Sequence, residues 1–489
     1  MAAVQRASHT TKFAKRLSFL GSPNARFFAL VAFIALVAFT GGASRHDVAS
    51  LIVLRPLAIL FMAYALLTLT AEQLSSVRGP LLIVVSLLAV CALQLVPLPH
   101  AFWSGLPARD VIAELDSALG IGEIWRPLSL DPNRTWNTFF SLFVPLAAIL
   151  LLALQPRENL RFVVPILFAV GLVGLLFGTL QMIGDRAFYL YEITNIDRPV
   201  GLFSNRNHQA VVFAWMIPAM VWAVLSLRRG HGVGGFTLIM CGILYLLLLT
   251  MISFAGSRAG LLLAVPGTAL AAWLLLRSDA AARGKLAVVE KATRKILRIF
   301  AVVAGLLVIG LAAAVLTMGD NAALQRFFED DAASGLRYDI FPTLIRMVAD
   351  FFPFGSGFGS FDSVYRSFET EGDLSARYVN QAHNDVLQIL IEGGLPAAVI
   401  VVAALAWLLK ATLRAARADD PEKKVLGIFI LVSAGIFLAA SALDYPLRTP
   451  LAATMLAVLT ATLSRLGKRD PEAADRTRPR TSRSRHETR

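Results

Sequence analysis

Apolar residues occur in long blocks along most of the chain, and short polar connections separate them. An α-helix needs about 17–25 mainly apolar residues to cross a bilayer, and the blocks have this length. The pattern therefore predicts about twelve membrane-spanning helices. The predicted spans are 27–42, 51–70, 80–98, 137–155, 161–183, 209–227, 235–255, 259–276, 299–318, 391–409, 425–443 and 449–464.

Composition agrees with this interpretation. Of the 489 residues, 56% are hydrophobic and 16% are charged, whereas soluble domains average about 45–50% apolar and about 25% charged residues. This excludes a soluble enzyme, a secreted disulfide-rich protein and a disordered regulator. Cys91 and Cys241 both lie inside apolar blocks, which favours buried packing over a disulfide or a metal pair. We predict an all-α polytopic membrane protein.

The basic residues separate onto alternate connections, which predicts the orientation. One side receives the basic residues of 1–26, 228–229, 277–298, 410–424 and the segment after Arg465. Because Lys and Arg concentrate on the cytoplasmic side of membrane proteins, we expect this side, and both termini, to be cytoplasmic. The net charge of +13 is then explained by orientation, and we expect no nucleic acid partner.

Three regions follow from this topology. Residues 1–26 form a cytoplasmic N-terminal segment, 27–465 a transmembrane domain, and 466–489 a basic, disordered cytoplasmic tail that faces membrane lipids. On the opposite face two connections are long, at 99–136 and 319–390. The second is a large periplasmic loop before the tenth span.

Polar residues on the predicted outer face concentrate in four short segments. They are 198–208, 257–260, the group formed by Gly335, Arg337 and 353–359, and 383–394. A fifth and weaker segment, 444–448, receives no role. Together the four segments bring several arginines, several glycines and a histidine to the outer surface of the membrane.

These residue types suit chemistry on a lipid-linked diphosphate. The planar guanidinium group of arginine matches phosphate oxygens and stays charged. Histidine is the residue type whose unperturbed pKa lies near neutrality, as a general base requires, and the fourth segment contains His383. Arg258 lies between two apolar spans with almost no loop, where an unpaired charge costs roughly 2.5–3.5 kcal/mol at bilayer depth and less near the interface. Such residues usually pair or serve a site.

Each segment also has a purely structural interpretation. Arg198 and Arg206 could extend toward lipid phosphates at the end of a span. Asn205 and Asn207 could cap the following helix. The glycine-rich run 355–359 could be an ordinary turn cluster instead of a phosphate-binding loop.

The four segments resemble the bacterial O-antigen ligase and Wzy-type polymerase superfamily, over roughly residues 130–465. The matching motifs are Phe203-Ser-Asn-Arg-Asn-His-Gln-Ala210, Ser257-Arg-Ala-Gly260, the run 353–359, and His383-Asn-Asp-Val-Leu-Gln388 with Glu392-Gly393.

The resemblance implies a metal-independent glycosyltransferase of the bacterial inner membrane that needs no cofactor. Such an enzyme moves a glycan from undecaprenyl diphosphate to an acceptor hydroxyl on the periplasmic face. The acceptor is the lipid A core, a growing polysaccharide or a protein. Ligase and polymerase are not separable at this stage.

The resemblance also implies roles for individual residues. Arg198 and Arg258 match arginines that hold the donor diphosphate, and His383 matches the histidine of the large periplasmic loop. Glu392 is an alternative base. The remaining predicted binding residues for diphosphate or glycan are Arg337, Asn205, Asn207, Arg206, His208 and Asn384.

A transporter or flippase of a lipid-linked glycan or another solute is the alternative function. Transporters place polar groups near the middle of the membrane, often on broken helices. The predicted spans contain few such groups, of which Arg55 beside Pro56 is the clearest. Because most of the polar residues lie at the outer surface, the sequence favours the enzyme.

Overall fold

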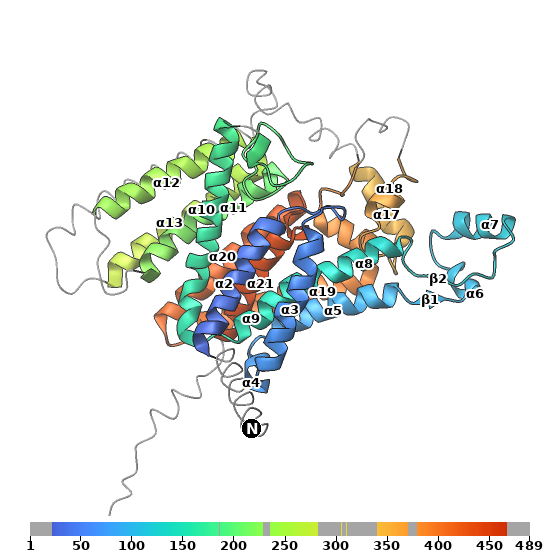
Figure 1. Cartoon of the computed structure of the whole chain (residues 1–489), viewed down its shortest axis with the longest axis horizontal. Coiled ribbons are helices and arrows are strands. Elements are labelled where there is room, and N and C mark those ends of the chain that lie inside the picture. Colours follow the sequence, from blue (N-terminus) through green and yellow to red (C-terminus); the bar gives the residue numbers. More distant parts are fainter. Residues whose placement is uncertain are drawn as a thin grey trace, which may run out of the picture.

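The computed structural model describes residues 22–184, 186–227, 235–281, 305, 310, 340–369 and 379–466. Within them the protein is a bundle of α-helices, with a single two-stranded sheet outside it (Figure 1). The prediction of a mainly helical membrane protein is confirmed in this part of the chain.

The described residues up to 227 form ten α-helices. They are α2 (Pro23–Thr40), α3 (Leu51–Thr68), α4 (Ala71–Ser76), α5 (Arg78–Gln94), α6 (His100–Trp103), α7 (Asp110–Ala118), α8 (Pro132–Ser141), α9 (Phe143–Ala153), α10 (Val163–Ile183) and α11 (Arg206–Leu227). Short 3-10 helices occur at η1 (Arg157–Phe162) and η2 (Arg186–Phe188). The strands β1 (Pro97–Leu98) and β2 (Arg126–Pro127) pair in antiparallel fashion.

The second half contributes α12 (Gly235–Phe254), α13 (Arg258–Ala281), α17 (Phe341–Phe351), α18 (Phe361–Tyr365), α19 (Asp385–Ala416), α20 (Pro421–Leu443), the 3-10 helix η5 (Pro446–Arg448) and α21 (Pro450–Leu466).

Nine helices in the described residues are long and apolar enough to span a membrane, and α5 and α21 are shorter apolar helices. Every predicted span overlaps one of these eleven helices except 299–318, which falls almost entirely outside the described residues. The total of about twelve spans, the orientation and the cytoplasmic termini stay predictions.

Helix α11 lies at the centre of the bundle and packs most extensively against α13. Of the candidate spans it is the most buried, with 78% of its apolar window inside the protein. A Cβ atom on Gly267 of α13 would lie 2.7 Å from the carbonyl oxygen of Ala214 on α11. Because only glycine permits this approach, the two backbones pack directly against each other, as small residues allow in membrane helices.

Several connections meet at one end of the bundle, which we call the site end. Helices α3, α11, α13, α19 and α21 begin there, and α2, α12 and α20 end there. The carbonyl of Gly41, directly after α2, accepts a hydrogen bond of 2.8 Å from the Leu451 N–H at the start of α21.

The predicted long connections form folded structure at this end. Residues 97–127 make a hairpin-like extension with α6 and α7, which projects away from the bundle (Figure 1). The described part of the large loop forms α17 and α18, which share a separate apolar core that includes Ile340, Met347, Phe351 and Phe361. The described part of the loop is therefore a small packed unit resting on α19.

Candidate functional site

The start of α11 positions four of the predicted site residues. Asn205 Oδ1 accepts a hydrogen bond of 2.8 Å from the Asn207 N–H, and the Asn205 carbonyl accepts from the Gln209 N–H at 3.3 Å. This is the geometry of a helix N-cap. The capping interpretation is thus confirmed for Asn205, whereas the side chain of Asn207 makes a different contact.

Two arginines meet at the tight connection between α12 and α13. Gly256 adopts a left-handed conformation, with φ of +63°. A Cβ atom built on it would lie 3.3 Å from Arg206 Nη1 and 3.7 Å from Arg198 Nη1, so both guanidinium groups reach this turn. Arg198 Nη1 also donates to the Phe254 carbonyl at 3.3 Å. Arg206 is buried, and Arg198 is half-buried.

Arg258 follows directly as the first residue of α13, and it is exposed. Its neighbours have local structural tasks. Ser257 Oγ accepts a hydrogen bond of 3.1 Å from the Gly260 N–H. A Cβ atom on Gly260 would lie 2.7 Å from Ala210 Cβ of α11. The Ser-Arg-Ala-Gly segment therefore holds α13 against α11, and Arg258 lies two residues after Gly256, the turn that Arg198 and Arg206 reach. We call these three residues the arginine cluster.

His383 contacts a carboxylate from a different part of the chain. Its Nδ1 lies 3.0 Å from Asp444 Oδ1, in the segment that follows α20. The second carboxylate oxygen, Asp444 Oδ2, accepts a hydrogen bond of 2.9 Å from Asn207 Nδ2. A neutral histidine that donates from Nδ1 has a lone pair on Nε2. Asp444 therefore favours the tautomer in which Nε2 can accept a proton.

The ring of Tyr445 supports this arrangement. Its centroid lies 4.9 Å from that of His383 and 4.9 Å from that of His208. Asn205 Nδ2 approaches Tyr445 Oη at 3.4 Å. His208 is almost completely buried and also packs edge-on against Phe203. Both histidines therefore contact the ring of one tyrosine, and His383 is the more exposed of the two.

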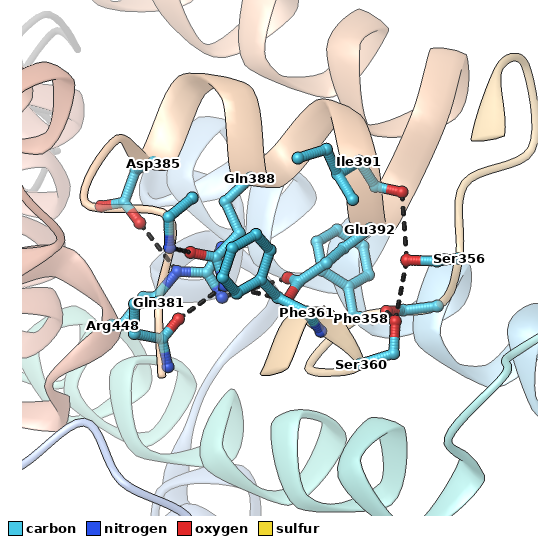
Figure 2. Close-up of polar contacts among 12 residues, drawn as sticks. Ser356, Phe358, Ser360, Phe361, Gln381, Asp385, Gln388, Ile391, Glu392 and Arg448 are labelled. Atoms are coloured by element: carbon cyan, nitrogen blue, oxygen red, sulfur yellow. Dashed lines mark hydrogen bonds and ion pairs between the residues drawn. The ribbon is translucent and has the colours of Figure 1, made fainter. Parts of the chain in front are cut away.

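A buried network of charges lies beneath the histidine. Arg448 Nε donates to Asp385 Oδ1 at 2.8 Å, and Arg448 Nη1 donates to Glu392 Oε2 at 3.1 Å (Figure 2). Asp385 and Glu392 are two turns apart on one face of α19. Burial alone would lower the pKa of Arg448, but the charges of Glu392 and Asp385 outweigh it and hold the pKa above its ordinary value.

The surroundings of Glu392 do not favour a catalytic base. The side chain is completely buried. Its Oε1 accepts hydrogen bonds from Gln388 Nε2 at 2.9 Å and from the Phe361 N–H at 3.3 Å, while Oε2 is held by Arg448. Both oxygens are thus engaged within the protein, so we assign Glu392 a structural task.

N–H groups of the glycine-rich run 355–359 donate hydrogen bonds to oxygen atoms of the same chain. The N–H groups of Ser356 and Gly357 donate to the carbonyls of Ile391 and Glu392 at 2.8 and 2.9 Å. Ser356 Oγ also donates to the Ile391 carbonyl at 3.2 Å (Figure 2). The Phe358 N–H donates to Gln94 Oε1 at 2.8 Å. These donors are not directed at a ligand, so the turn-cluster interpretation fits the structure and the phosphate-binding one does not.

Comparison with known proteins identifies the chain at this point. Residues 243–402 match the family model described as O-antigen ligase. This match supports membership of the O-antigen ligase superfamily. The matched residues include Arg258 and His383 and lie within the predicted region 130–465. No curated protein matches the chain.

Part of the candidate site lies outside the matched residues. Arg198 and the start of α11 precede it, and Asp444, Tyr445 and Arg448 follow it. The sequence alone indicates no role for the segment 444–448. In the structure its residues Asp444 and Arg448 bind the side chains of His383, Asn207, Asp385 and Glu392. Its signal in the sequence is an acid directly after an apolar span, followed four residues later by an arginine.

Two other predicted residues have different outcomes. Asn384 Oδ1 accepts from the Leu387 N–H at 3.1 Å and so caps α19. Arg337 lies outside the described residues. Among the described side chains, no three of the types His, Cys, Asp and Glu come together as a metal-binding group.

Proposed function

We propose that this chain transfers a glycan from undecaprenyl diphosphate to an acceptor hydroxyl on the periplasmic face of the bacterial inner membrane. One observation carries the proposal. Two consecutive residues at the start of α11 reach two different groups: Arg206 belongs to the arginine cluster, and Asn207 binds the carboxylate that holds His383. A donor site and an acceptor site are therefore adjacent at the site end.

The arginine cluster would bind the donor diphosphate. Arg198, Arg206 and Arg258 supply three permanent positive charges and planar donor groups, which match phosphate oxygens. During transfer, negative charge builds up on the departing polyprenyl diphosphate. Fixed positive charges stabilise this transition state without reorganisation, which is usually a large part of catalysis. The arginines would provide the stabilisation that a divalent cation provides elsewhere, so the proposal includes no metal and no cofactor.

His383 would act on the acceptor. Nε2 takes the proton of the acceptor hydroxyl, whose oxygen forms the new bond to the anomeric carbon. The bond between that carbon and the diphosphate oxygen breaks, and its electron pair leaves with the polyprenyl diphosphate. Asp444, on the opposite side of the ring, stabilises the resulting imidazolium and fixes its orientation.

The other predicted residues divide by their contacts. Asn207 would position Asp444, Asn205 would cap α11, and His208 would pack Tyr445. Arg337 and Asn384 stay proposed contacts of the donor or its glycan. The acceptor would be the lipid A core, a growing polysaccharide or a protein.

The transporter alternative receives less support. Transporters place charged groups on broken helices near mid-membrane. Here the arginine cluster and the His383–Asp444 pair lie where helices begin and end. This location suits a reaction at the membrane surface better than passage through the bundle.

Reconstitution tests the proposal. The purified chain in liposomes, given a donor whose glycan is linked to undecaprenyl diphosphate, should elongate a glycan acceptor or glycosylate lipid A core. Which of the two occurs distinguishes polymerase from ligase. Chelation of divalent cations should leave the turnover within a few-fold of its starting value. Absence of transfer to either acceptor and to protein, with donor movement across the bilayer instead, would support the transporter.

A further inference from the structure

A pocket of about 500 Å³ opens at the site end, away from the arginine cluster. It lies between the connection 41–50, the first turns of α3 and the end of α8. Most of its wall is apolar, and Leu51, Ile52, Pro56, Ile59 and Phe140 form it. Its ionisable lining residues are His46, Asp47 and Arg55.

Arg55 carries a charge that its protein contacts do not neutralise. Its Nη2 donates to Asn137 Oδ1 and, at 2.9 Å, to Ser141 Oγ on α8, which are both neutral groups. Its Nε is buried and has no hydrogen-bond partner. No carboxylate of the described residues lies within ion-pair distance of it. A guanidinium in apolar surroundings without a counterion is costly, which indicates that an anion completes the site.

The one carboxylate in the pocket does not supply this counterion. Asp47 is paired with Arg45, with distances of 2.6 and 3.0 Å between their oxygen and nitrogen atoms. The hydrogen bond from Arg45 holds the pKa of Asp47 below its ordinary value, so the pair is charged and internally balanced. Arg55 therefore contributes the unbalanced positive charge of the pocket.

We propose that this pocket binds the phosphate headgroup of a membrane lipid, with Arg55 contacting the phosphate and the apolar wall covering the first part of the chains. The wall favours a lipid over a soluble anion. Ile52, Ile59 and Phe140 are 77%, 38% and 39% exposed, so the pocket opens sideways onto the surface that faces lipid. A glycerophospholipid and a polyprenyl phosphate share this chemistry.

The pocket adjoins the candidate active site but is separate from it. The Gly42 N–H, in the same connection, donates to Tyr191 Oη at 2.7 Å, and the Gly42 carbonyl accepts from the Ser204 N–H at 3.2 Å. Lipid binding here would steady the segment that carries Arg206. The inference does not depend on glycosyl transfer, because its test measures binding.

Native mass spectrometry of the purified full-length chain in detergent provides the test. The probes are phosphatidylglycerol and a diacylglycerol that has the same chains but no phosphate. We expect tighter binding of phosphatidylglycerol and about tenfold weaker binding to Arg55→Gln, the scale of one lost charge-assisted hydrogen bond. Arg346→Gln, which changes an exposed arginine on α17, should bind as the wild type does.

A second variant separates ligand loss from misfolding. Ile59→Trp should fill the pocket without removing the bonds of Arg55 to α8, and it should weaken phosphatidylglycerol binding as well. Wild-type affinity in both Arg55→Gln and Ile59→Trp overturns the proposal. Competition with undecaprenyl phosphate then identifies the source of the phosphate. If undecaprenyl phosphate displaces phosphatidylglycerol, the site binds a polyprenyl lipid. If it does not, the site binds a glycerophospholipid. Equal displacement by inorganic phosphate alone overturns the lipid assignment.

Discussion

Asp444 fixes the His383 ring through one carboxylate oxygen while its other oxygen binds Asn207. Removing the charge but not the shape of this group isolates its effect. Asp444→Asn should lower glycosyl transfer by about two orders of magnitude or more, the usual contribution of a positioned general base. The measurement is transfer rate per membrane-inserted molecule. Asp350→Asn, in an exposed pair with Arg346, is the control; equal rates for the two variants would mean that Asp444 does not position the base.

A substitution of Arg258 tests whether the planar shape of its guanidinium group matters in addition to its positive charge. Lysine keeps the positive charge but cannot form the two parallel bonds that a guanidinium makes to a diphosphate. Arg258→Lys should therefore insert normally, yet transfer should fall by roughly two orders of magnitude, the scale of losing one preorganised donor. Arg346→Lys should leave the rate nearly unchanged, and His383→Ala should abolish it. Near-normal transfer in both Arg258→Lys and His383→Ala would show that the proposed site is wrong.

Individual residues can be recognised from the sequence where their chemistry is local. Residues whose role depends on a tertiary contact cannot. The arginines and His383 are conspicuous because charged groups at span ends are costly and need a reason. Asp444 is not conspicuous: only the packing of α20 against α19 places it beside a histidine that lies 61 residues away in the chain. Glu392 is a possible base in the sequence for a similar reason, because its partner Arg448 lies 56 residues away in the chain.

At the scale of elements, α19 is the clearest difference between prediction and structure. Its span was predicted from residue 391, but the helix begins at Asp385 and breaks at Gly394, where φ is +56° and ψ is −148°. The first turns contain Asp385 and Glu392. Because both residues are charged, their hydropathy favours a position outside the membrane. They are helical because Asn384 caps them and Arg448 neutralises them.

The charge network predicts the stability of this element. Arg448→Met would leave two buried carboxylates without their cation, which should lower the free energy of unfolding by about 3–5 kcal/mol. Arg346→Met removes an exposed pair and should cost less than about 1 kcal/mol. Denaturant unfolding in detergent micelles compares the two variants. Similar stabilities would mean that the network contributes little to holding α19.

At the scale of the whole molecule, hydropathy located the spans well because lipid-facing helices must be apolar along their whole length. The connection 97–127 was not anticipated as folded structure. There Trp103 is buried, donates from Nε1 to the Pro127 carbonyl at 2.9 Å, and has Arg109 and Arg126 over its ring. Short elements held by such contacts have no periodic pattern for the sequence to reveal.

Every proposed role depends on the orientation of the bundle in the membrane. Because basic residues gather on one side, a reporter active only in the periplasm should be active when fused after residue 365 and silent after residues 285 and 480. Residue 365 ends α18, whose first residue, Phe361, donates its N–H to Glu392, so this fusion reports on the site end. A fusion at Gly120, in the extension formed by α6 and α7, should also be active and does not depend on the large loop. Activity after 285 and 480 with silence after 365 and 120 would put the arginine cluster and His383 in the cytoplasm, where a periplasmic acceptor cannot reach them.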